Sequence, residues 1–316
     1  MTDNLTEHRI SANGTELNVL ELGPSDAPCV IMVHGLRDSA WSLLPVAQLL
    51  VSPGGPDSSQ PDGYRVLLPE LRGHGRSARS DAYAMPNFLL DLHAVVEHFT
   101  AKPSTECAVF GHSLGGHIVT KYAALFPEVV KTVLVVEGLG PPTRPHEGKP
   151  AEEIRAYREM LLARLSTRPS QGKPLTGLED AAARLQRNNP RLQPDETQRI
   201  TPHLLEEVDG QLRWAFDSRA NGVFLGVSTA DNLRFWQQVQ APTCLVSGAL
   251  SYEYWGSQMN TPGFSGHFAA GEMETRAQNF QIQQHHWFEN SGHMVHYDEP
   301  ERLGHLCRQY LEQHYV

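Results

Sequence analysis

Ser113 has the surroundings in this sequence that most directly suggest chemistry. It stands at the centre of "GHSLG", a G-x-S-x-G pattern, between Gly111 and Gly115. Val109 and Phe110 end an apolar run before it, and apolar residues at helical spacing follow, which predicts a strand-to-helix turn. Glycines let the strand and the helix pass closely, and a serine there adopts a strained backbone that exposes its hydroxyl. The pattern therefore predicts a nucleophile.

A serine hydroxyl needs an adjacent base, and His293 is the candidate for that role. The chain has 16 histidines, but His293 lies in the glycine-bearing loop "ENSGHMVHYDEP", between the last predicted strand and the final helix. We expect this loop at the carboxyl edge of the sheet, the same edge as Ser113, where ligands bind in open α/β sheets. Gly292 gives His293 freedom to turn inward, and His296 is the alternative in the same loop.

Backbone N–H groups that stabilise an oxyanion are expected from two segments. His34-Gly35 ends the apolar run of "IMVHGLRDSAW", and the loop that follows runs over the same sheet edge. The expected donors are the N–H of Leu36 and that of Leu114, the residue after the serine. A glycine that merely ends a strand is the alternative interpretation of the first segment.

The elements that must position these residues alternate along the chain. Asn13-Gly14, between two alternating runs, predicts a β-hairpin. Apolar runs typical of buried strands then alternate with runs at helical spacing. We expect further strands at 29–35, 64–71, 106–112, 129–138, 242–248 and 281–289, and helices at 39–51, 86–99, after Ser113, at 270–280 and from 300. This order predicts a mainly parallel sheet covered by helices on both faces.

The alternation is interrupted from about 140 to 239, where the chain is mostly polar, helical in pattern and punctuated by prolines. One sheet domain that carries a helical insertion explains this most simply. We therefore expect a core formed by residues 1–139 and 240–316, with 140–239 inserted between them. A Pro/Gly/Ser loop is expected at 51–63, and no internal repeat is visible.

Composition limits the classes of function. The 316 residues are 40% hydrophobic and 20% charged, as in globular proteins, and the formal net charge of −10 argues against nucleic acid and anionic membranes as partners. We see neither an apolar run of bilayer length nor a secretory signal, and therefore expect a cytoplasmic protein. The four cysteines lack C-x-x-C spacing, and buried reduced thiols are the expected state.

Four motifs in this order, "HGLRDSAW", "LPELRGHGRS", "VFGHSLGG" and "SGHMVHYDEP", resemble the α/β-hydrolase fold family from about Arg9 to Tyr310. The resemblance implies the chain order nucleophile, acid, histidine, with a helical cap inserted after the sixth strand, which the 140–239 stretch matches. The second motif is similar to the family's loop after its fourth strand, beside the pocket. His74 within it is expected to be structural and not catalytic.

The resemblance also indicates where the acid lies. Most of the family places an aspartate after the seventh strand, but here "LVSGALSYEYW" has Ser251 at that position. The family's other known position, used with a glutamate by the haloalkane dehalogenases, is the end of the sixth strand, where this chain has Glu137. About one helix, a turn and a strand separate it from Ser113, so the same sheet edge is expected. Glu137 is the preferred acid and Glu253 the alternative, and a dyad without an acid or with another carboxylate stays open.

The reaction implied by this resemblance is acyl transfer to water, because a serine nucleophile forms an acyl ester. The expectation is a serine hydrolase that cleaves a small to medium carboxylic ester, thioester or lactone in a pocket under the cap. A C–C bond hydrolase or a cofactor-free haloperoxidase is one alternative, and a non-catalytic ligand-binding protein is another. A small-molecule acyl substrate is the expected partner, and the oligomeric state stays open.

No cofactor or metal is expected from the motifs. His285-His286 has no third ligand at a suitable spacing and is interpreted as strand surface, and no Walker or G-x-G-x-x-G pattern occurs. Trp214 and Phe216 either line the pocket or pack within the cap. Arg37, beside the oxyanion loop, either meets an acidic substrate or is a solvated loop arginine.

Overall fold

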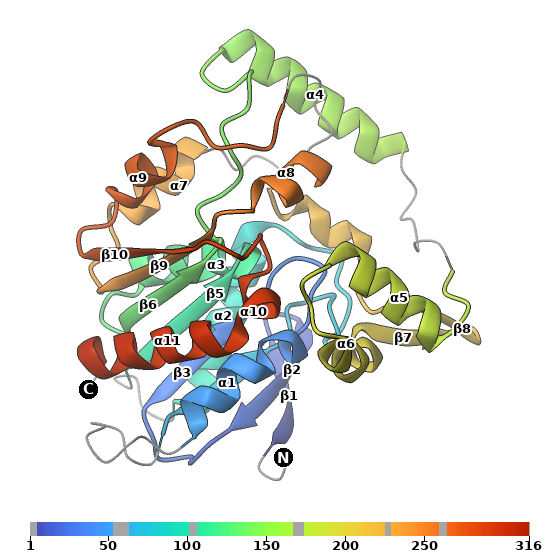
Figure 1. Ribbon diagram of the computed structural model, residues 1–316, viewed down its shortest axis with the longest axis vertical. Coiled ribbons are helices and arrows are strands. Elements are labelled where there is room, and N and C mark those ends of the chain that lie inside the picture. Colours follow the sequence, from blue (N-terminus) through green and yellow to red (C-terminus); the bar gives the residue numbers. More distant parts are fainter. Residues whose placement is uncertain are drawn as a thin grey trace.

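The computed structural model describes residues 5–52, 63–100, 106–166, 174–224, 229–258 and 264–315 (Figure 1). Its centre is an eight-stranded sheet in the order β1-β2-β4-β3-β5-β6-β9-β10. The strands are β1 (Thr6–Ala12), β2 (Thr15–Leu22), β3 (Cys29–Val33), β4 (Arg65–Pro69), β5 (Cys107–His112), β6 (Val130–Val136), β9 (Thr243–Gly248) and β10 (Gln283–Phe288). The loop predicted at 51–63 lies almost wholly outside the described residues.

The sheet is parallel from β4 to β10, and only β1 and β2 run antiparallel to their neighbours. The predicted hairpin joins these two strands, with Ala12 opposite Thr15. Asn13 and Gly14 both have positive φ (43° and 73°), as a two-residue hairpin turn requires. The predicted mainly parallel sheet is confirmed.

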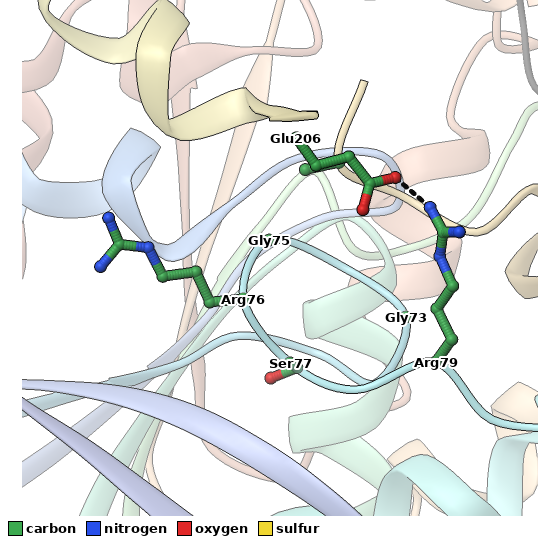
Figure 2. Close-up of a pocket in the computed structure, with 7 residues that line it drawn as sticks. Gly73, Gly75, Arg76, Ser77, Arg79 and Glu206 are labelled. Atoms are coloured by element: carbon green, nitrogen blue, oxygen red, sulfur yellow. Dashed lines mark hydrogen bonds and ion pairs between the residues drawn. The ribbon is translucent and has the colours of Figure 1, made fainter. Parts of the chain in front are cut away.

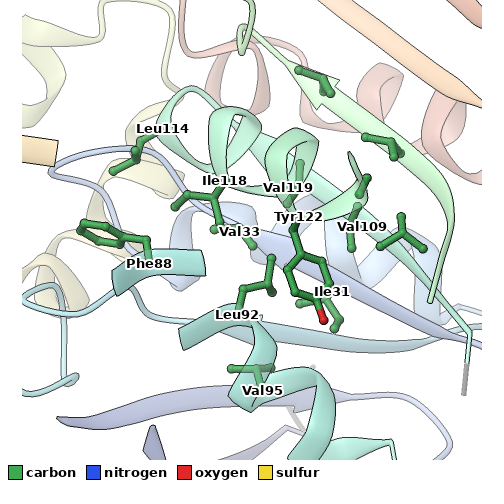
Figure 3. Close-up of a cluster of buried hydrophobic side chains, with 14 of the residues drawn as sticks. Ile31, Val33, Phe88, Leu92, Val95, Val109, Leu114, Ile118, Val119 and Tyr122 are labelled. Carbon is green, nitrogen blue, oxygen red and sulfur yellow. The ribbon is translucent and has the colours of Figure 1, made fainter. Parts of the chain in front are cut away.

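Each central strand places alternate residues in two separate apolar layers. Ile31, Val109 and Val133 belong to one cluster, whereas Met32 and Phe110 belong to the other. Such strands are apolar on both faces because helices cover both sides, which explains their near-continuous hydrophobic runs. Figure 3 shows the first cluster, in which side chains of β3 and β5 pack against α2 and α3.

The helices form two layers over the sheet (Figure 1). α1 (Leu44–Val51) and α11 (Pro300–His314) supply the second cluster, and α2 (Met85–Phe99), α3 (Leu114–Leu125), α7 (Thr229–Trp236) and α9 (Glu272–Ala277) supply the first. The remaining helices are α4 (Pro150–Ser166), α5 (Leu178–Asn188), α6 (Pro194–Ile200), α8 (Tyr252–Gln258) and α10 (Val295–Asp298), and the 3₁₀ turns are η1 (Ala40–Leu43), η2 (Thr201–Leu204) and η3 (Ser218–Phe224).

The stretch predicted as a helical insertion also contains a pair of strands, β7 (Leu205–Val208) and β8 (Gln211–Trp214). The sequence analysis missed this hairpin, although Asp209-Gly210 is a turn signal and both residues have positive φ. At the end of the stretch, α7 buries Trp236 in the first core cluster, while α4 lies at the top of Figure 1 with Ile154 exposed. The extent of a separate cap stays a prediction.

The four cysteines, at positions 29, 107, 244 and 307, are buried and unbridged. Burial raises the pKa of the Cys29 thiol to about 12 and that of Cys244 to about 12, so these thiols stay protonated and behave as small apolar side chains. No helix among the described residues is both long enough and apolar enough to cross a bilayer.

The crossing of β5 and α3 leaves no space for side chains at two glycines. A Cβ at Gly111 would overlap the backbone carbonyl of Gly115, and a Cβ at Gly115 would overlap the carbonyl of Val33. All of these neighbours are backbone atoms of packed elements, so they cannot move aside cheaply. This close approach holds the end of β5 and the start of α3 together, with Ser113 between them.

We predict that Gly115→Ala lowers the free energy of unfolding by about 1–3 kcal/mol, because overpacking forces backbone shifts. Urea denaturation followed by circular dichroism measures the effect. Gly256→Ala is the matched control: its Cβ would make only an ordinary contact of 3.5 Å within α8, so it is expected to be neutral or slightly stabilising. Equal stability of the two variants would contradict this interpretation of the crossing.

Candidate active site

Ser113 lies at the turn where β5 ends and α3 begins, as predicted. Its backbone has φ 51° and ψ −113°, a strained conformation for a residue with a side chain. Its N–H donates to the carbonyl of Val136 (2.9 Å), which ties the turn to the neighbouring strand β6. The residue as a whole is half-buried.

His293 lies in the loop between β10 and α10, and the structure brings its ring to Ser113. The distance from His293 Nε2 to Ser113 Oγ is 3.0 Å. The ring of Tyr254 stacks on the imidazole with centroids 4.0 Å apart, and Trp255 contacts it edge-on at 4.9 Å. These two aromatic side chains from α8 fix the ring plane, so the imidazole is held ready to interact with the hydroxyl.

Glu137 directly follows β6 and is the carboxylate that contacts His293. Its Oε2 lies 2.9 Å from His293 Nδ1, and its Oε1 accepts a hydrogen bond from the N–H of Gly248 (2.7 Å). Glu137 has φ 53° and is only 6% exposed. Both carboxylate oxygens are therefore engaged, and the interaction with Nδ1 favours the tautomer that leaves Nε2 free to accept the serine proton.

The alternative acid and base of the sequence analysis have other partners. Glu253 pairs with Arg191 (2.9 Å) at a half-exposed position of α8. His296 directs Nε2 to Asp38 Oδ2 (3.2 Å) and is buried behind the loop. Neither side chain takes part in the described contacts that join Ser113, His293 and Glu137.

The loop after β3 packs directly against the serine. A Cβ at Gly35 would lie 3.2 Å from Ser113 Cβ and 2.7 Å from His112 Nδ1, so only glycine permits this approach. Leu36 follows at a half-buried position. Leu114 opens α3, and the first N–H groups of a helix have no intrahelical acceptor. These two N–H groups remain the predicted oxyanion donors.

His74 supports the loop after β3 through a hydrogen bond to its backbone. His74 Nε2 accepts the N–H of Arg37 (3.0 Å), and Nδ1 lies 3.0 Å from the carbonyl of Arg72. Desolvation by burial, together with the neighbouring ring of His34, lowers the pKa of His74 to about 3, so the ring is neutral at physiological pH. A neutral ring can donate from Nδ1 and accept at Nε2.

A second buried group lies behind the loop of His293, and the sequence analysis did not anticipate it. Asp38 accepts hydrogen bonds from Tyr297 (2.9 Å) and from His296, and His112 Nε2 donates to the carbonyl of His293 (2.9 Å). The possible ligand atoms of Asp38, His112 and His296 lie within 4.8 Å of one another. Each of these side chains makes at least one hydrogen bond to a neighbour, and we assign the group to support of the loop, although Nδ1 of His112 and Nδ1 of His296 have no hydrogen-bond partner among the described residues.

The other residues considered from the sequence lie apart from these contacts. His285 lies on β10, as predicted, with Nε2 at 3.0 Å from Ser247 Oγ. Trp214 packs at the edge of the second core cluster, and Phe216 lies under the guanidinium of Arg37. Whether Trp214 lines a substrate pocket stays a prediction.

A hollow of about 270 Å³ opens beside the loop after β4 (Figure 2). Arg79 pairs with Glu206 across it, and Arg76 pairs with Glu7. Its lining residues are Gly73, Gly75, Arg76, Ser77, Arg79, Glu206 and Ala215. Ser113, His293 and Glu137 are not among the residues that line this hollow. Both of its arginines already form ion pairs.

Comparison with known proteins gives one family. The model described as "Alpha/beta hydrolase family" matches residues 30–305. The chain is 27% identical over 225 residues to a serine hydrolase-like protein from Danio rerio, covering 68% of this chain and 63% of that protein. It is 33% identical over 128 residues to a bifunctional esterase/perhydrolase from Acinetobacter calcoaceticus, covering 39% and 41%. The chain thus spans less than two thirds of these relatives.

Among solved structures, the thioesterase domain from the curacin biosynthetic pathway superposes with a TM-score of 0.75. It is 22% identical and the match covers 96% of this chain and 98% of that domain. At this level of identity the likeness establishes the fold, and the reaction has to be argued from the residues of this chain.

We predict that His74 makes stability fall with acid. Its native pKa of about 3 lies below the ordinary value of 6.5, so below pH 6.5 the unfolded chain binds a proton that the native protein excludes. Between pH 7.5 and 5.5 this costs about 1.4 kcal/mol of unfolding free energy, which urea denaturation at both pH values measures.

His74→Gln should remove that share of the pH dependence, because an amide can replace both hydrogen bonds without titrating. His305→Gln, at an exposed position of α11, serves as the control and should keep the wild-type difference between the two pH values. An identical difference in wild type and His74→Gln would refute the role of His74.

Proposed function

The chain belongs to the alpha/beta hydrolase family, and from this premise we propose that it is a serine hydrolase that cleaves a carboxylic ester, thioester or lactone. The observation that carries the proposal is the 3.0 Å contact between Ser113 Oγ and His293 Nε2, with Glu137 on the opposite ring nitrogen. A hydroxyl, an imidazole and a carboxylate in this order form the arrangement that makes serine nucleophilic.

Ser113 attacks the acyl carbon in the first step, and His293 Nε2 takes the hydroxyl proton. The same nitrogen then delivers the proton to the leaving group, and an acyl ester of Ser113 remains. Water, deprotonated by His293, attacks this ester and releases the acid. The strained backbone at Ser113 supports the proposal because such strain recurs where a side chain must be presented precisely.

Glu137 keeps the imidazole in the productive tautomer and stabilises the imidazolium that forms during each step. Its second oxygen is held by the N–H of Gly248, so the carboxylate cannot rotate away from the ring without losing a hydrogen bond. This position after β6 replaces the aspartate that most of the family carries after the seventh strand, where Ser251 stands here.

The N–H groups of Leu36 and Leu114 are the proposed oxyanion donors. Gly35 places the first against Ser113, and the start of α3 supplies the second. Donors fixed by the backbone require no reorganisation when charge develops on the acyl oxygen. The segment 140–239 is proposed to cap this edge of the sheet and to confine the substrate.

A cofactor-free haloperoxidase is the second candidate, because one relative, from Burkholderia pyrrocinia, is named a non-heme chloroperoxidase. A C–C bond hydrolase stays the other alternative. Substrate profiling distinguishes these reactions. p-Nitrophenyl esters of rising chain length test ester cleavage, and vinylogous diketones test cleavage of C–C bonds. Hydrogen peroxide and bromide in acetate buffer, with a monochlorinated diketone as the halogen acceptor, test the haloperoxidase reaction.

We predict that a fluorophosphonate probe labels the protein at Ser113 and that Ser113→Ala abolishes both labelling and hydrolysis of p-nitrophenyl acetate. The physical reason is that the probe reacts only with an activated hydroxyl. Gel fluorescence and mass spectrometry of the labelled peptide measure the site. Absence of labelling in the folded wild type would favour a non-catalytic ligand-binding protein.

We predict that Glu137→Gln lowers kcat roughly 10³- to 10⁴-fold. The amide oxygen can keep the hydrogen bond from Gly248, so the NH₂ group faces Nδ1 and forces the proton onto Nε2, where it blocks acceptance from Ser113. Steady-state kinetics on one p-nitrophenyl ester measures the loss. Glu253→Gln is the matched control and should change kcat less than about threefold, since Glu253 pairs with Arg191. The opposite ranking of the two variants would overturn the acid assignment.

A further inference from the structure

Arg37 lies two residues beyond Gly35, in the loop that packs against Ser113. It is an exposed arginine, and no carboxylate lies within ion-pair distance of it among the described residues. This contrasts with most arginines of the chain, such as Arg72 and Arg219, which pair with aspartates. The guanidinium of Arg37 thus has donors that no described carboxylate occupies.

The backbone of Arg37 is held in an unusual conformation. Its φ is 64°, in the left-handed region that residues with a Cβ rarely adopt. The N–H donates to the neutral, fully buried ring of His74 (3.0 Å), so the conformation is maintained from within the core. A merely solvated arginine needs neither the strain nor the buried acceptor.

The side chain of Arg37 is positioned as well. Its Nε donates to Asn221 Oδ1 (3.0 Å), and its guanidinium carbon lies 5.9 Å from the centre of the Phe216 ring. Asn221 is itself oriented by a hydrogen bond from its amide to the carbonyl of Ser218 (2.8 Å). One edge of the guanidinium is therefore occupied, and the two terminal nitrogens, which have no hydrogen-bond partner among the described residues, can form a planar fork.

Tyr254 supplies a second donor on the same side of the site. Its ring stacks on His293, which places it beside the reacting groups. Burial raises the pKa of the Tyr254 phenol; the positive charge of Arg37 opposes this shift and the negative charge of Glu137 adds to it. The phenol stays protonated at neutral pH, and no described residue accepts its proton.

We propose that Arg37 and the hydroxyl of Tyr254 bind a carboxylate on the substrate, so that the preferred substrates are esters or thioesters that carry a free carboxylate near the scissile carbonyl. The inference rests on the proposed function and names its substrate class. A protein of net charge −10 repels such anions over most of its surface, and one fixed guanidinium at the loop beside Ser113 is the group that accepts them. A monoester of a dicarboxylic acid is the simplest member of the class.

The test uses two nearly isosteric substrates, the mono-p-nitrophenyl ester of glutaric acid and the p-nitrophenyl ester of glutaramic acid. The first carries a free carboxylate where the second carries a neutral amide. Wild type should prefer the carboxylate ester by at least about tenfold in kcat/KM. Arg37→Gln should lower kcat/KM for that ester about 10- to 100-fold, mostly through KM, and should change the amide ester less than about threefold.

Lys131→Gln is the control variant, because it removes a positive charge at the amino end of β6, the end of that strand opposite to Glu137. It should leave both esters unaffected. Tyr254→Phe should lower kcat/KM for the carboxylate ester specifically, while the ring that stacks on His293 is kept. Equal losses for both esters in Arg37→Gln, or no preference in wild type, would overturn the proposal.

Labelling by the fluorophosphonate probe separates this subsite from the proposed reaction. Arg37→Gln should label at Ser113 as fast as wild type, because the probe carries no carboxylate. Free glutarate should protect wild type from labelling and should not protect Arg37→Gln. Labelling without protection by glutarate would refute the carboxylate site and leave the serine hydrolase standing, whereas loss of labelling in wild type would refute the hydrolase itself.

Discussion

The backbone of α3 passes so close to β3 and β5 that residues 111 and 115 have no room for a Cβ, and this contact holds Ser113 at φ 51°. A side chain at either glycine would push the helix away from the sheet and relax the turn. The serine would then lose both its strained backbone and its place beside the first N–H of the helix. Packing energy in the core thus maintains the geometry of the candidate site.

A parallel sheet brings the other members of the candidate site to the same edge. The carboxyl ends of β5, β6 and β10 meet there, and each is followed by one member of the group formed by Ser113, Glu137 and His293. The carboxylate of Glu137 is almost fully buried, and its interactions with the imidazole and with the N–H of Gly248 offset the cost of removing it from water. A buried carboxylate with both oxygens engaged is a rigid support for the histidine.

Other buried histidines surround this group and connect the loops around it by hydrogen bonds. Buried neutral rings of His34 and His74 accept N–H groups from Leu71 and Arg37, and His112 donates to the carbonyl of His293. Burial lowers the pKa of all three rings, so each offers one donor and one acceptor without carrying charge. They join loops far apart in sequence, which explains why a chain with 16 histidines uses so many in its interior.

Short-range pattern determined much of this protein from sequence alone: the apolar runs predicted the parallel sheet, and "GHSLG" predicted the strained turn at Ser113. The sequence did not predict the β7–β8 hairpin because its strands are mostly polar, and the Asp-Gly turn is the only signal for it. Only the tertiary structure shows that Glu137 and not Glu253 contacts His293, that Asp38 lies behind the histidine loop, and that Arg37 has no carboxylate partner among the described residues. The local sequence pattern predicts the secondary structure around a residue. The partner of a charged side chain depends on which distant loops the sheet brings together.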